Sequence, residues 1–456
     1  MEKRFVFKGK EIGRVGFFGS GASNLALLDY LKKRYPYIEF TLRSDAPVKS
    51  PDGILRSFFG KDIAKDPTED LLFFSPSVRR ERAELQRLKE TGMIFSSDVE
   101  FFFEKKAVPV FSVTGSDGKS TTVTIASLMM SESVGSFPAS ANIGVPITSL
   151  LENDSVCGTV AELSSFQLSY FSPRSERALI TNVSENHLDW HSSFDEYVLA
   201  KENVLRFAEK RIFNLDSKIC RDLTDNYEAF AVYSKNLSCK AMQKLYDAEH
   251  YFSVEDGHIL HNGKKFLALD EILCKGEHNI TNFLAANALC ADAVDKNVAK
   301  KIARSFTPLH HRCELVGIYD GISFYDSSID STPTRTRTTL SAFSAPTVLI
   351  LGGRGKNLSY ENLFPINRAL KAVVLTGENH KEIQAELFRH KEFISGRIPV
   401  YYAEDFYDCT ELAISLAVQG DAVLLSPAST SFDKFSDYKQ RGKIFSDIIK
   451  KHYAAP

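Results

Sequence analysis

Short apolar runs alternate with longer stretches of mixed polarity along the chain, which predicts strands and helices in alternation. The short runs are rich in Val, Ile, Leu and Phe and suit buried strands, whereas the longer stretches have the length of helices. The first part of the chain starts with a strand, a glycine turn and a helix. Its expected elements are strands at 14–18, 38–42 and 71–74, a turn at 19–24, and helices at 25–33 and 79–91.

The same alternation continues to the end of the chain, and it indicates an α/β fold with layered, doubly wound sheets. Boundaries are expected near 104–107 and 307–308, which divides the chain into domains at 1–105, 106–308 and 309–456. The later expected elements are strands at 108–113, 159–163, 178–182, 347–351, 372–376, 400–403 and 422–425, and helices at 123–130, 197–207 and 280–292.

Composition narrows the range of partners. The 456 residues, 43% of them hydrophobic and 25% charged, suffice for several domains with separate cores. A net charge of -2 gives no general attraction to nucleic acid or anionic lipid. Seven cysteines without any Cys-x-x-Cys pair indicate neither a disulfide framework nor a thiolate zinc site. No apolar run suits a signal peptide or a membrane span, so we expect a cytoplasmic monomer with small-molecule partners.

The first glycine turn is a weak nucleotide signal. Gly19 and Gly21 lack the third glycine of a dinucleotide fingerprint, and the second expected strand ends without the acidic residue that binds a ribose in NAD sites. The turn suits a nucleotide, but NAD is not expected.

A phosphate-binding loop between an expected strand and an expected helix is the strongest chemical signal. Two glycines let the backbone close around phosphate oxygens, Lys119 neutralises the β- and γ-phosphates, and Ser120 is placed to hold Mg²⁺. Val113 stands where the general pattern has its first glycine, so the loop is the shortened T-G-x-x-G-K-[ST] form. Its residues, the expected ATP-phosphate contacts, are Thr114, Gly115, Ser116, Asp117, Gly118, Lys119, Ser120 and Thr121.

This loop form, together with the segment E-L-S-S-F-Q-L at 162–168, resembles the Mur ligase family, and in particular its D-glutamate-adding members. Folylpolyglutamate synthases share the loop. Further segments that resemble the family are N-V-S-E-N-H-L-D at 182–189, Y-V-L-A-K-E-N at 197–203, H-N-I-T-N at 278–282, P-L-H-H-R-C-E at 308–314, G-G-R-G-K at 352–356 and S-P-A-S-T-S-F-D-K-F at 426–435. The resemblance implies a Rossmann-like first domain for a UDP substrate, a central P-loop ATPase domain and a Rossmann-like last domain for an amino acid.

The resemblance also implies a catalytic centre with two Mg²⁺ ions. Lys119, His187 and Lys201 are the implied catalytic residues, and Lys201 is the lysine that CO₂ carbamylates in the family. Carbamylation needs a neutral amine, so burial must lower the pKa of Lys201. Taken without the family, Glu162 could instead cap the next helix, His187 could be structural and Lys201 could be a solvated helix lysine. The implied metal ligands are Ser120, Glu162, His187 and Lys201.

Other implied ATP contacts lie near the second boundary. Asn279 and Asn282 are one helical turn apart, so both amides can face the adenine, although Asn279 also suits a helix N-cap. Arg312 would reach the ATP phosphates, or else be an ordinary linker charge. Ser327 occupies the family's aspartate position if Ser331 matches the substrate-contacting threonine.

The register of that last segment has an alternative. Shifting it by one residue restores Asp326 to the aspartate position but places Asp330, a negative charge, against an acidic substrate. We prefer the first register. The implied UDP-substrate contacts are Ala22, Ser23, Arg43, Ser75, Asn142, Ser164 and Gln167, and the implied D-glutamate contacts are Ser331, Lys356, Ser431, Phe432 and Tyr438.

The resemblance therefore implies an ATP- and Mg²⁺-dependent ligase that joins D-glutamate to UDP-MurNAc-L-Ala through an acyl phosphate, for peptidoglycan synthesis. Two alternatives stay open. One is another Mur-type or folylpolyglutamate-synthase-like ligase, and the other is a nucleotide-binding regulator without turnover.

Overall fold

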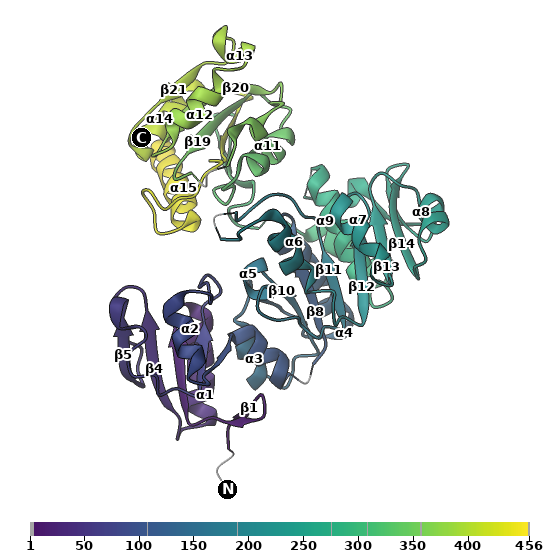
Figure 1. The fold of residues 1–456 in the computed structure, drawn as a ribbon. Helices are drawn as coiled ribbons and strands as arrows, with labels where there is room; N and C mark the ends of the chain where they lie inside the picture. The colour runs from purple at the N-terminus through teal and green to yellow at the C-terminus, as the bar shows by residue number, and fades with distance from the viewer. Residues whose placement is uncertain are drawn as a thin grey trace. The chain divides into compact units, whose positions relative to one another are not determined.

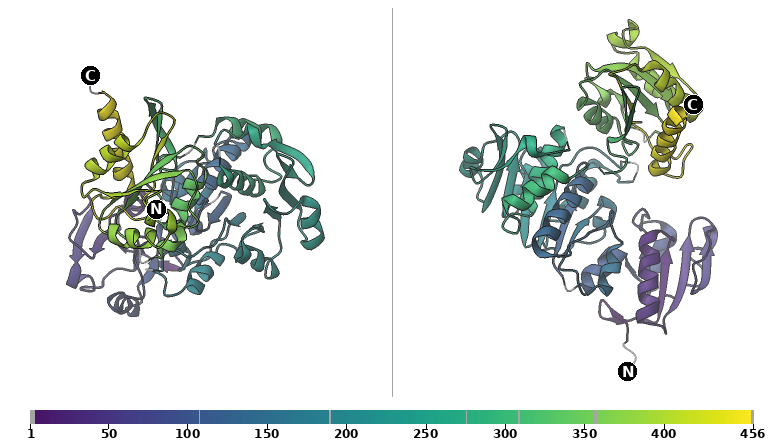
Figure 2. Two further views of the ribbon diagram at one scale, coloured as in Figure 1. Left: turned by 90° about the horizontal axis from the view of Figure 1, so that it is seen from above. Right: turned by 180° about the vertical axis from the view of Figure 1, so that it is seen from behind.

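The computed structural model describes residues 4–106, 108–188, 190–274, 276–307, 309–355 and 358–454. The chain forms two compact units. The first contains Met1–Ile272 and Ile280–Ser305, and the second contains Leu273–Asn279 and Phe306–Pro456. Three large sheets carry the fold, two in the first unit and one in the second (Figures 1 and 2).

The N-terminal sheet is five-stranded and wholly parallel, in the order β5-β4-β3-β6-β7. Aromatic side chains of β3 and β6 pack with those of α3, so this core is unusually rich in phenylalanine. Its strands are β3 (Arg14–Phe18), β4 (Glu39–Ser44), β5 (Ile54–Phe59), β6 (Leu71–Phe74) and β7 (Ile94–Ser96); its helices are α1 (Ala22–Arg34), η1 (Gly60–Asp62), α2 (Ala83–Glu90) and α3 (Asp98–Lys105); a separate hairpin joins β1 (Val6–Phe7) and β2 (Lys10–Glu11).

The central sheet has nine strands in the order β16-β15-β14-β13-β12-β11-β8-β10-β9, parallel from β9 to β14 and antiparallel beyond. Strand β8, which leads into the phosphate loop, lies between β10 and β11. The strands are β8 (Val110–Thr114), β9 (Ala139–Ala141), β10 (Thr159–Glu162), β11 (Arg177–Ile180), β12 (Lys210–Asn214), β13 (Ala231–Ser234), β14 (His250–Glu255), β15 (His258–His261) and β16 (Lys264–Ala268). The helices are α4 (Lys119–Val134), η2 (Ile147–Glu152), α5 (Ser165–Leu168), α6 (Phe194–Glu202), α7 (Lys218–Asp222), η3 (Leu223–Asp225), α8 (Cys239–Leu245), η4 (Leu269–Glu271), α9 (Glu277–Leu289) and α10 (Lys296–Ser305).

The C-terminal sheet has six strands in the order β17-β18-β22-β19-β20-β21, and only the β17–β18 pair is antiparallel. Helices pack around the sheet and bury two apolar clusters. The strands are β17 (Glu314–Tyr319), β18 (Ile322–Asp326), β19 (Thr347–Gly352), β20 (Leu370–Thr376), β21 (Val400–Tyr402) and β22 (Ala422–Leu425); the helices are α11 (Pro333–Ser341), η5 (Tyr360–Leu363), α12 (His380–Leu387), α13 (Lys391–Ile394), α14 (Phe406–Leu416) and α15 (Tyr438–Ala454).

The α/β class predicted from the sequence is confirmed, and several helix limits differ from prediction. Helix α4 begins at Lys119 rather than 123, because left-handed Gly118 is its N-cap. Helix α2 begins at Ala83 rather than 79, and α6 spans Phe194–Glu202 rather than 197–207. The Ser193 hydroxyl caps α6 by accepting from Glu196 N, a start signal that the apolar pattern does not reveal.

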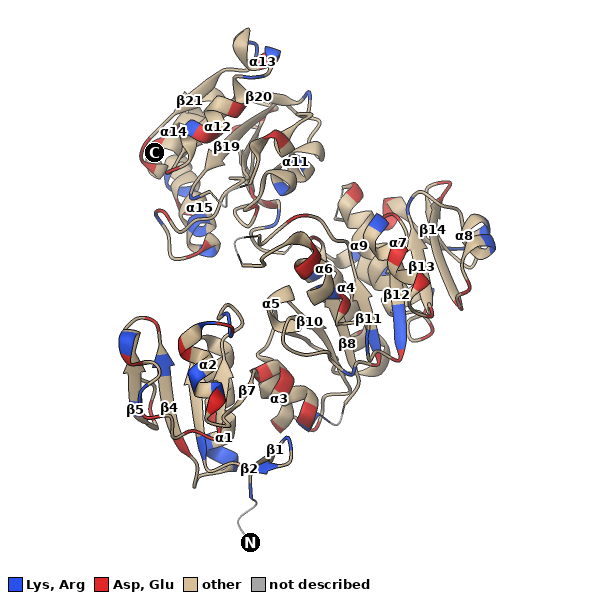
Figure 3. Cartoon of the chain, in the orientation of Figure 1, with Lys and Arg blue, Asp and Glu red and all other residues tan. Residues whose placement is uncertain are grey.

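Charged side chains are dispersed over the fold. Figure 3 shows Lys and Arg interspersed with Asp and Glu around each of the large sheets. None of the helices in the described part of the chain has the length and apolar composition needed to cross a bilayer.

Candidate active site

The turn between β8 and α4 has a backbone that requires two glycines. Gly115 and Gly118 have φ of +148° and +77°, which L side chains rarely adopt. A Cβ atom at Gly115 would overlap the Thr181 hydroxyl, and one at Gly118 would lie 2.5 Å from Asn282 Oδ1. No side chain caps the first turn of α4, which follows directly. The amides of that turn point toward the loop, as in helices that bind phosphate.

The end of β11 holds this loop in place. Ser116 N donates to Asn182 O at 2.8 Å, and Asp117 N donates to Asn182 Oδ1 at 3.0 Å. The Thr181 hydroxyl donates to Asp117 O at 2.6 Å, and the Ser116 and Tyr197 hydroxyls are 2.9 Å apart. Sequence reasoning gave no role to Thr181 or Tyr197, because their partners are more than 60 residues away.

Lys119 folds over the loop from the first turn of α4. Its Nζ donates to Gly115 O at 2.8 Å and to Ser116 O at 3.1 Å. Ser120 and Thr121 follow on the same turn and are buried. The ammonium and the Ser120 hydroxyl are thus both held at the loop, as binding a nucleotide phosphate and its metal requires.

Lys201 is buried against the same loop. Its side chain is only 2% exposed, its Nζ donates to Gly115 O at 2.7 Å, and it lies 4.5 Å from the Tyr197 ring centroid. Burial lowers the pKa of Lys201 well below its ordinary value, and repulsion from Lys119 lowers it further, against the attraction of carboxylates that include Glu162. Lys201 is therefore not a solvated helix lysine, and its environment favours the neutral amine.

Glu162 supplies a buried carboxylate beside the loop. It pairs with Val113 across β10 and β8, so the end of its strand adjoins the start of the loop. Asn142 Nδ2 donates to Glu162 Oε1 at 3.4 Å, whereas the buried Oε2 has no hydrogen-bond partner among the described residues. An unpaired carboxylate oxygen is costly to bury, so the Glu162 carboxylate fits a divalent cation.

His187 lies in a strained turn next to an aromatic cluster. Its φ is +57°, and its ring packs edge-on against Phe166 with centroids 4.9 Å apart. Its carbonyl accepts from the amides of Trp190 at 3.0 Å and His191 at 2.9 Å. A non-glycine residue in this backbone region is typical of functional turns.

Helix α5, which follows Glu162, is closed by its own capping box. The Ser164 hydroxyl accepts from Gln167 N at 3.2 Å, and Gln167 Oε1 accepts from Ser164 N at 2.9 Å. The alternative in which Glu162 caps this helix is therefore wrong. Ser164 and Gln167 thus have a structural role, and their contact with the substrate stays a prediction.

Arg43, predicted to contact the UDP group, is used differently. It is fully buried, and Nε and Nη2 donate to the two Glu69 carboxylate oxygens at 2.8 and 2.7 Å. The remaining donors reach the carbonyls of Ile63, Lys65 and Asp66. A guanidinium has five N–H groups, and all five have partners here. In this structure Arg43 fastens the 63–69 loop to β4, and its contact with the UDP group stays a prediction.

The other N-terminal residues predicted to bind substrate gather at the first glycine turn. Asn24 Nδ2 donates to Gly19 O at 2.8 Å and to Ser75 Oγ at 3.2 Å, so this turn and the end of β6 are joined. Ser23, which follows Ala22 at the start of α1, is beside Asp98, and burial raises the pKa of the Asp98 carboxyl to about 6. Strands β3 and β6 run parallel, so the glycine turn after β3 and Ser75 after β6 lie at the same edge of the sheet. Ligands bind at the carboxyl ends of the strands in such folds.

The two asparagines of α9 belong to different compact units. Asn279 lies inside the helix, since α9 begins at Glu277, and its Nδ2 donates to Cys274 Sγ at 2.9 Å. The N-cap alternative for Asn279 is therefore wrong. Asn282 Oδ1 accepts from the Thr122 hydroxyl at 3.5 Å, on the helix that follows the phosphate loop.

In the second unit, the segment after β18, residues 327–332, holds the Asp330 carboxylate inside the fold. Asp330 is buried, and its Oδ2 accepts from the hydroxyls of Thr339 and Ser426, both at 2.7 Å. Ser327 Oγ accepts from a backbone amide at 3.1 Å. Because the Asp330 charge is engaged inside the unit, this geometry favours the register in which Ser331, not Asp330, matches the substrate-contacting residue.

A histidine–aspartate pair adjoins Arg312, the predicted phosphate contact. His311 Nδ1 is 2.7 Å from Asp326 Oδ2, and this hydrogen bond raises the pKa of His311. Gly442, on α15, packs so closely against the pair that a Cβ atom would overlap both side chains. The segment that carries Arg312 is thereby fixed to the end of β18 and to α15.

Three of the predicted D-glutamate contacts lie between the end of β22 and the start of α15. Ser431 is buried, Phe432 is 59% exposed, and Tyr438 begins α15. Buried Arg441 donates to the carbonyls of residues 328, 429 and 430, and so joins the two segments that carry Ser331 and Ser431; sequence reasoning gave it no role. Lys356 lies outside the described residues.

An α/β chain with a phosphate loop, a buried lysine and a buried carboxylate beside it defines a P-loop nucleotide-dependent enzyme. The chain belongs to the Mur ligase family. Residues 113–290 match the Mur ligase middle domain, and residues 311–429 match the Mur ligase glutamate ligase domain.

Similar proteins share this length and organisation. The UDP-N-acetylmuramoylalanine--D-glutamate ligase of Acetivibrio thermocellus is 36% identical, with 96% of each chain covered. The same-named ligase of Clostridium perfringens is 34% identical, with 98% of each covered. The solved structure of a UDP-N-acetylmuramate-alanine ligase from Thermotoga maritima matches this chain with a TM-score of 0.62 and 18% sequence identity. The match covers 96% of this chain and 99% of that one, and at this identity it shows similarity of fold only.

Proposed function

We propose that this chain joins D-glutamate to UDP-MurNAc-L-Ala, with ATP converted to ADP and phosphate. The relatives of matching length carry this activity in their names. The observation in the structure that carries the proposal is the burial of Lys201 against the phosphate loop, next to Glu162. A regulator that only binds nucleotide has no evident need for such a lysine.

The chemistry needs two successive transfers. The terminal carboxylate of UDP-MurNAc-L-Ala attacks the γ-phosphorus of ATP and releases ADP, which leaves an acyl phosphate. The amine of D-glutamate then attacks the acyl carbon, loses a proton and expels phosphate. Lys119 and the loop amides hold the phosphate oxygens on which charge builds, so the site works by positioning and electrostatics.

Ser120, Glu162, His187 and carbamylated Lys201 are the proposed holders of two Mg²⁺ ions, which would supply charge neutralisation at the phosphates. The neutral Lys201 amine would attack CO₂ and lose a proton, giving a carbamate. That reaction replaces a buried cation with an anion that can pair with a metal. The lowered pKa of Lys201 supports this step, because it increases the fraction of the reactive neutral amine.

We propose that Arg312 and Ser327 of the second unit contact ATP, and that Asn279 of the second unit and Asn282 of the first lie near the adenine. Ser331, Lys356, Ser431, Phe432 and Tyr438 would bind D-glutamate. In the first unit, the proposed contacts of the UDP substrate are Ala22, Ser23, Arg43, Ser75, Asn142, Ser164 and Gln167. ATP and UDP-linked precursors are cytoplasmic metabolites, so the cytoplasm is the proposed location and a monomer the proposed state.

Phosphate release is the direct test. Purified protein is incubated with ATP, Mg²⁺ and UDP-MurNAc-L-Ala, with D-glutamate, L-lysine or diaminopimelate as the amine. Release that depends on D-glutamate supports the proposal. Phosphate release with lysine or diaminopimelate instead of D-glutamate would identify the chain as a different ligase of the family. No phosphate release with any of the three amines would favour a regulator.

A further inference from the structure

Trp190, the only tryptophan of the chain, joins segments from two sheets of the first unit. Its indole Nε1 donates to Ser77 O at 3.0 Å. Ser77 belongs to the loop after β6, residues 75–82, which we call the substrate loop because it starts at Ser75. The Arg79 guanidinium of the same loop lies 5.4 Å from the indole ring centroid.

The other side of Trp190 faces the candidate catalytic centre. Its amide donates to His187 O at 3.0 Å. The Phe166 ring, between Ser164 and Gln167 on α5, lies 4.6 Å from the indole centroid. Trp190 thus contacts the substrate loop and helix α5 through its side chain, and the segment of the candidate metal ligand His187 through its backbone amide.

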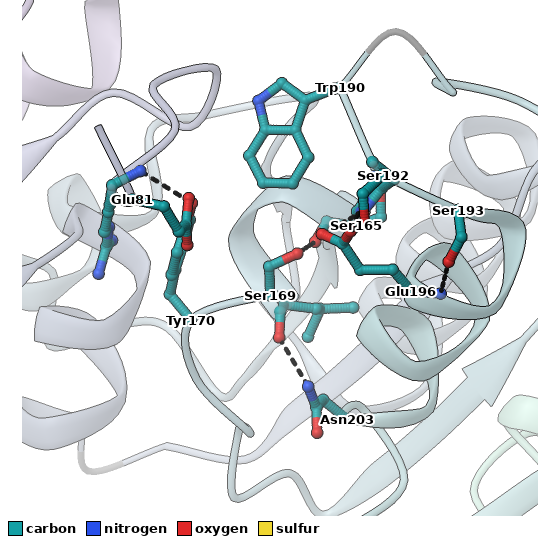
Figure 4. A network of polar contacts seen from close by, with 12 residues as sticks. Glu81, Ser165, Ser169, Tyr170, Trp190, Ser192, Ser193, Glu196 and Asn203 are labelled. Carbon is teal, nitrogen blue, oxygen red and sulfur yellow. Dashed lines mark hydrogen bonds and ion pairs between the residues drawn. The ribbon is translucent and has the colours of Figure 1, made fainter. Parts of the chain in front are cut away.

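Tyr170 adds a second connection at the same place (Figure 4). Its hydroxyl accepts from Arg80 N and donates to Glu81 Oε2, both at 3.0 Å, and its ring lies 6.2 Å from that of Trp190. Burial raises the pKa of Tyr170 to about 12, so the hydroxyl keeps the proton that it donates. The substrate loop is therefore held to the central sheet by two neighbouring aromatic residues.

We infer that Trp190 is a positioning residue that fixes the substrate loop at one distance from the His187 segment. This inference rests on the proposed function. The substrate must place its UDP group at the N-terminal sheet and its carboxylate at the phosphate loop, so it spans the two ends that Trp190 joins. If the contact between Trp190 and the substrate loop is lost, binding of the whole substrate must also order that loop, which costs binding free energy. A ligand that occupies only the N-terminal sheet or only the phosphate loop does not incur this cost.

Trp190→Phe tests this, because it keeps a six-membered ring that can pack against Phe166 and removes the indole N–H together with the five-membered ring that carries it. The expected result is a KM for UDP-MurNAc-L-Ala about fivefold higher, the effect of one lost neutral hydrogen bond, with kcat nearly unchanged. The dissociation constants of UDP alone and of ATP alone, measured by calorimetry, stay at the wild-type values. Tyr170→Phe should shift the same KM in the same direction.

Phe207→Leu is the matched control, since Phe207 is an exposed ring with Arg174 5.9 Å from its centroid, a comparable aromatic–arginine pair elsewhere on the central sheet. It should leave every constant unchanged. An unchanged KM in both Trp190→Phe and Tyr170→Phe, or a rise in the UDP and ATP dissociation constants equal to the rise in KM, would overturn the inference. A wild-type protein without ligase activity would instead overturn the proposed function.

Discussion

Lys201 and Arg43 are two buried basic residues, and the free-energy cost of burying a charge is reduced in a different way at each. Lys201 has a single carbonyl partner, and its pKa is lowered, so it approaches neutrality. Arg43 cannot become neutral in a protein and instead has an acceptor for each donor, including the Glu69 carboxylate. The lowered pKa leaves Lys201 as a reactive amine, whereas the full set of acceptors makes Arg43 a structural contact between β4 and the 63–69 loop.

Replacing Lys201 with Ala should lower ligase activity by about 100-fold or more, because the proposed carbamate is lost from the metal centre. Acetate or another short carboxylic acid should restore part of the activity by occupying the vacated site. The assay is phosphate release with and without the acid. Lys244→Ala, at an exposed position of α8, serves as the control. Near-normal activity of Lys201→Ala without added acid would rule the carbamate out.

Arg43→Ala should destabilise the N-terminal sheet by about 3–5 kcal/mol, since it leaves Glu69 buried and unpaired. The double variant Arg43→Met/Glu69→Leu should recover much of that loss, which chemical denaturation would measure. Its KM for UDP-MurNAc-L-Ala is the decisive quantity. A KM close to the wild-type value supports a structural role for Arg43. A large rise in KM at recovered stability would instead support contact of Arg43 with the substrate.

At the scale of elements, the strand-loop-helix unit at β8 and α4 is where sequence reasoning succeeded best. The glycines, Lys119 and Ser120 lie close in sequence, so their local pattern carries the information. The anchors of the loop and the partner of Arg43 were missed because they are distant in sequence. The antiparallel hairpins β14–β16 were also not predicted, since their short edge strands have little apolar pattern. The burial of Arg43 was not predicted, because a motif position does not show whether a side chain is buried.

Gly118→Ala tests the loop as an element. A left-handed φ strains alanine by about 1–3 kcal/mol, and the added Cβ would also press on Asn282, so ATP affinity should fall at least about tenfold. Gly257→Ala is the matched control, because Gly257 has φ of +71° with nothing within 4 Å of the added atom. Calorimetric titration with ATP should show weaker binding only for Gly118→Ala. Equal affinities in the two variants would contradict the role given to this glycine.

At the scale of the whole molecule, pH acts on stability through buried titratable groups, of which Asp98 is one. Asp98 has a folded-state pKa of about 6, raised by burial from an ordinary value of 3.8. The folded chain therefore binds the proton more tightly than the unfolded chain. The stability contributed by protonated Asp98 is fully present below about pH 4 and is lost as pH rises through 6.

Asp98→Asn should remove this dependence, because the amide stays neutral. At pH 8 the variant should be more stable than wild type by up to about 3 kcal/mol, and at pH 4 the difference should vanish. Thermal unfolding across this pH range is the measurement, with Asp29→Asn on the exposed face of α1 as the control. A difference of the same size at both pH values would refute the assignment to Asp98.

The position of β8 inside the central sheet also sets an order for biosynthesis. The N-terminal sheet uses only residues 14–96, so it can form early, while the rest of the chain is still being translated. The phosphate loop is translated next, yet its neighbours β10 and β11 and its anchors Thr181 and Asn182 emerge about 45 to 65 residues later. A nascent chain that ends near residue 160 thus has the complete loop sequence without the contacts that shape it. We therefore expect the loop to take its nucleotide-binding shape only after Asn182 has been translated.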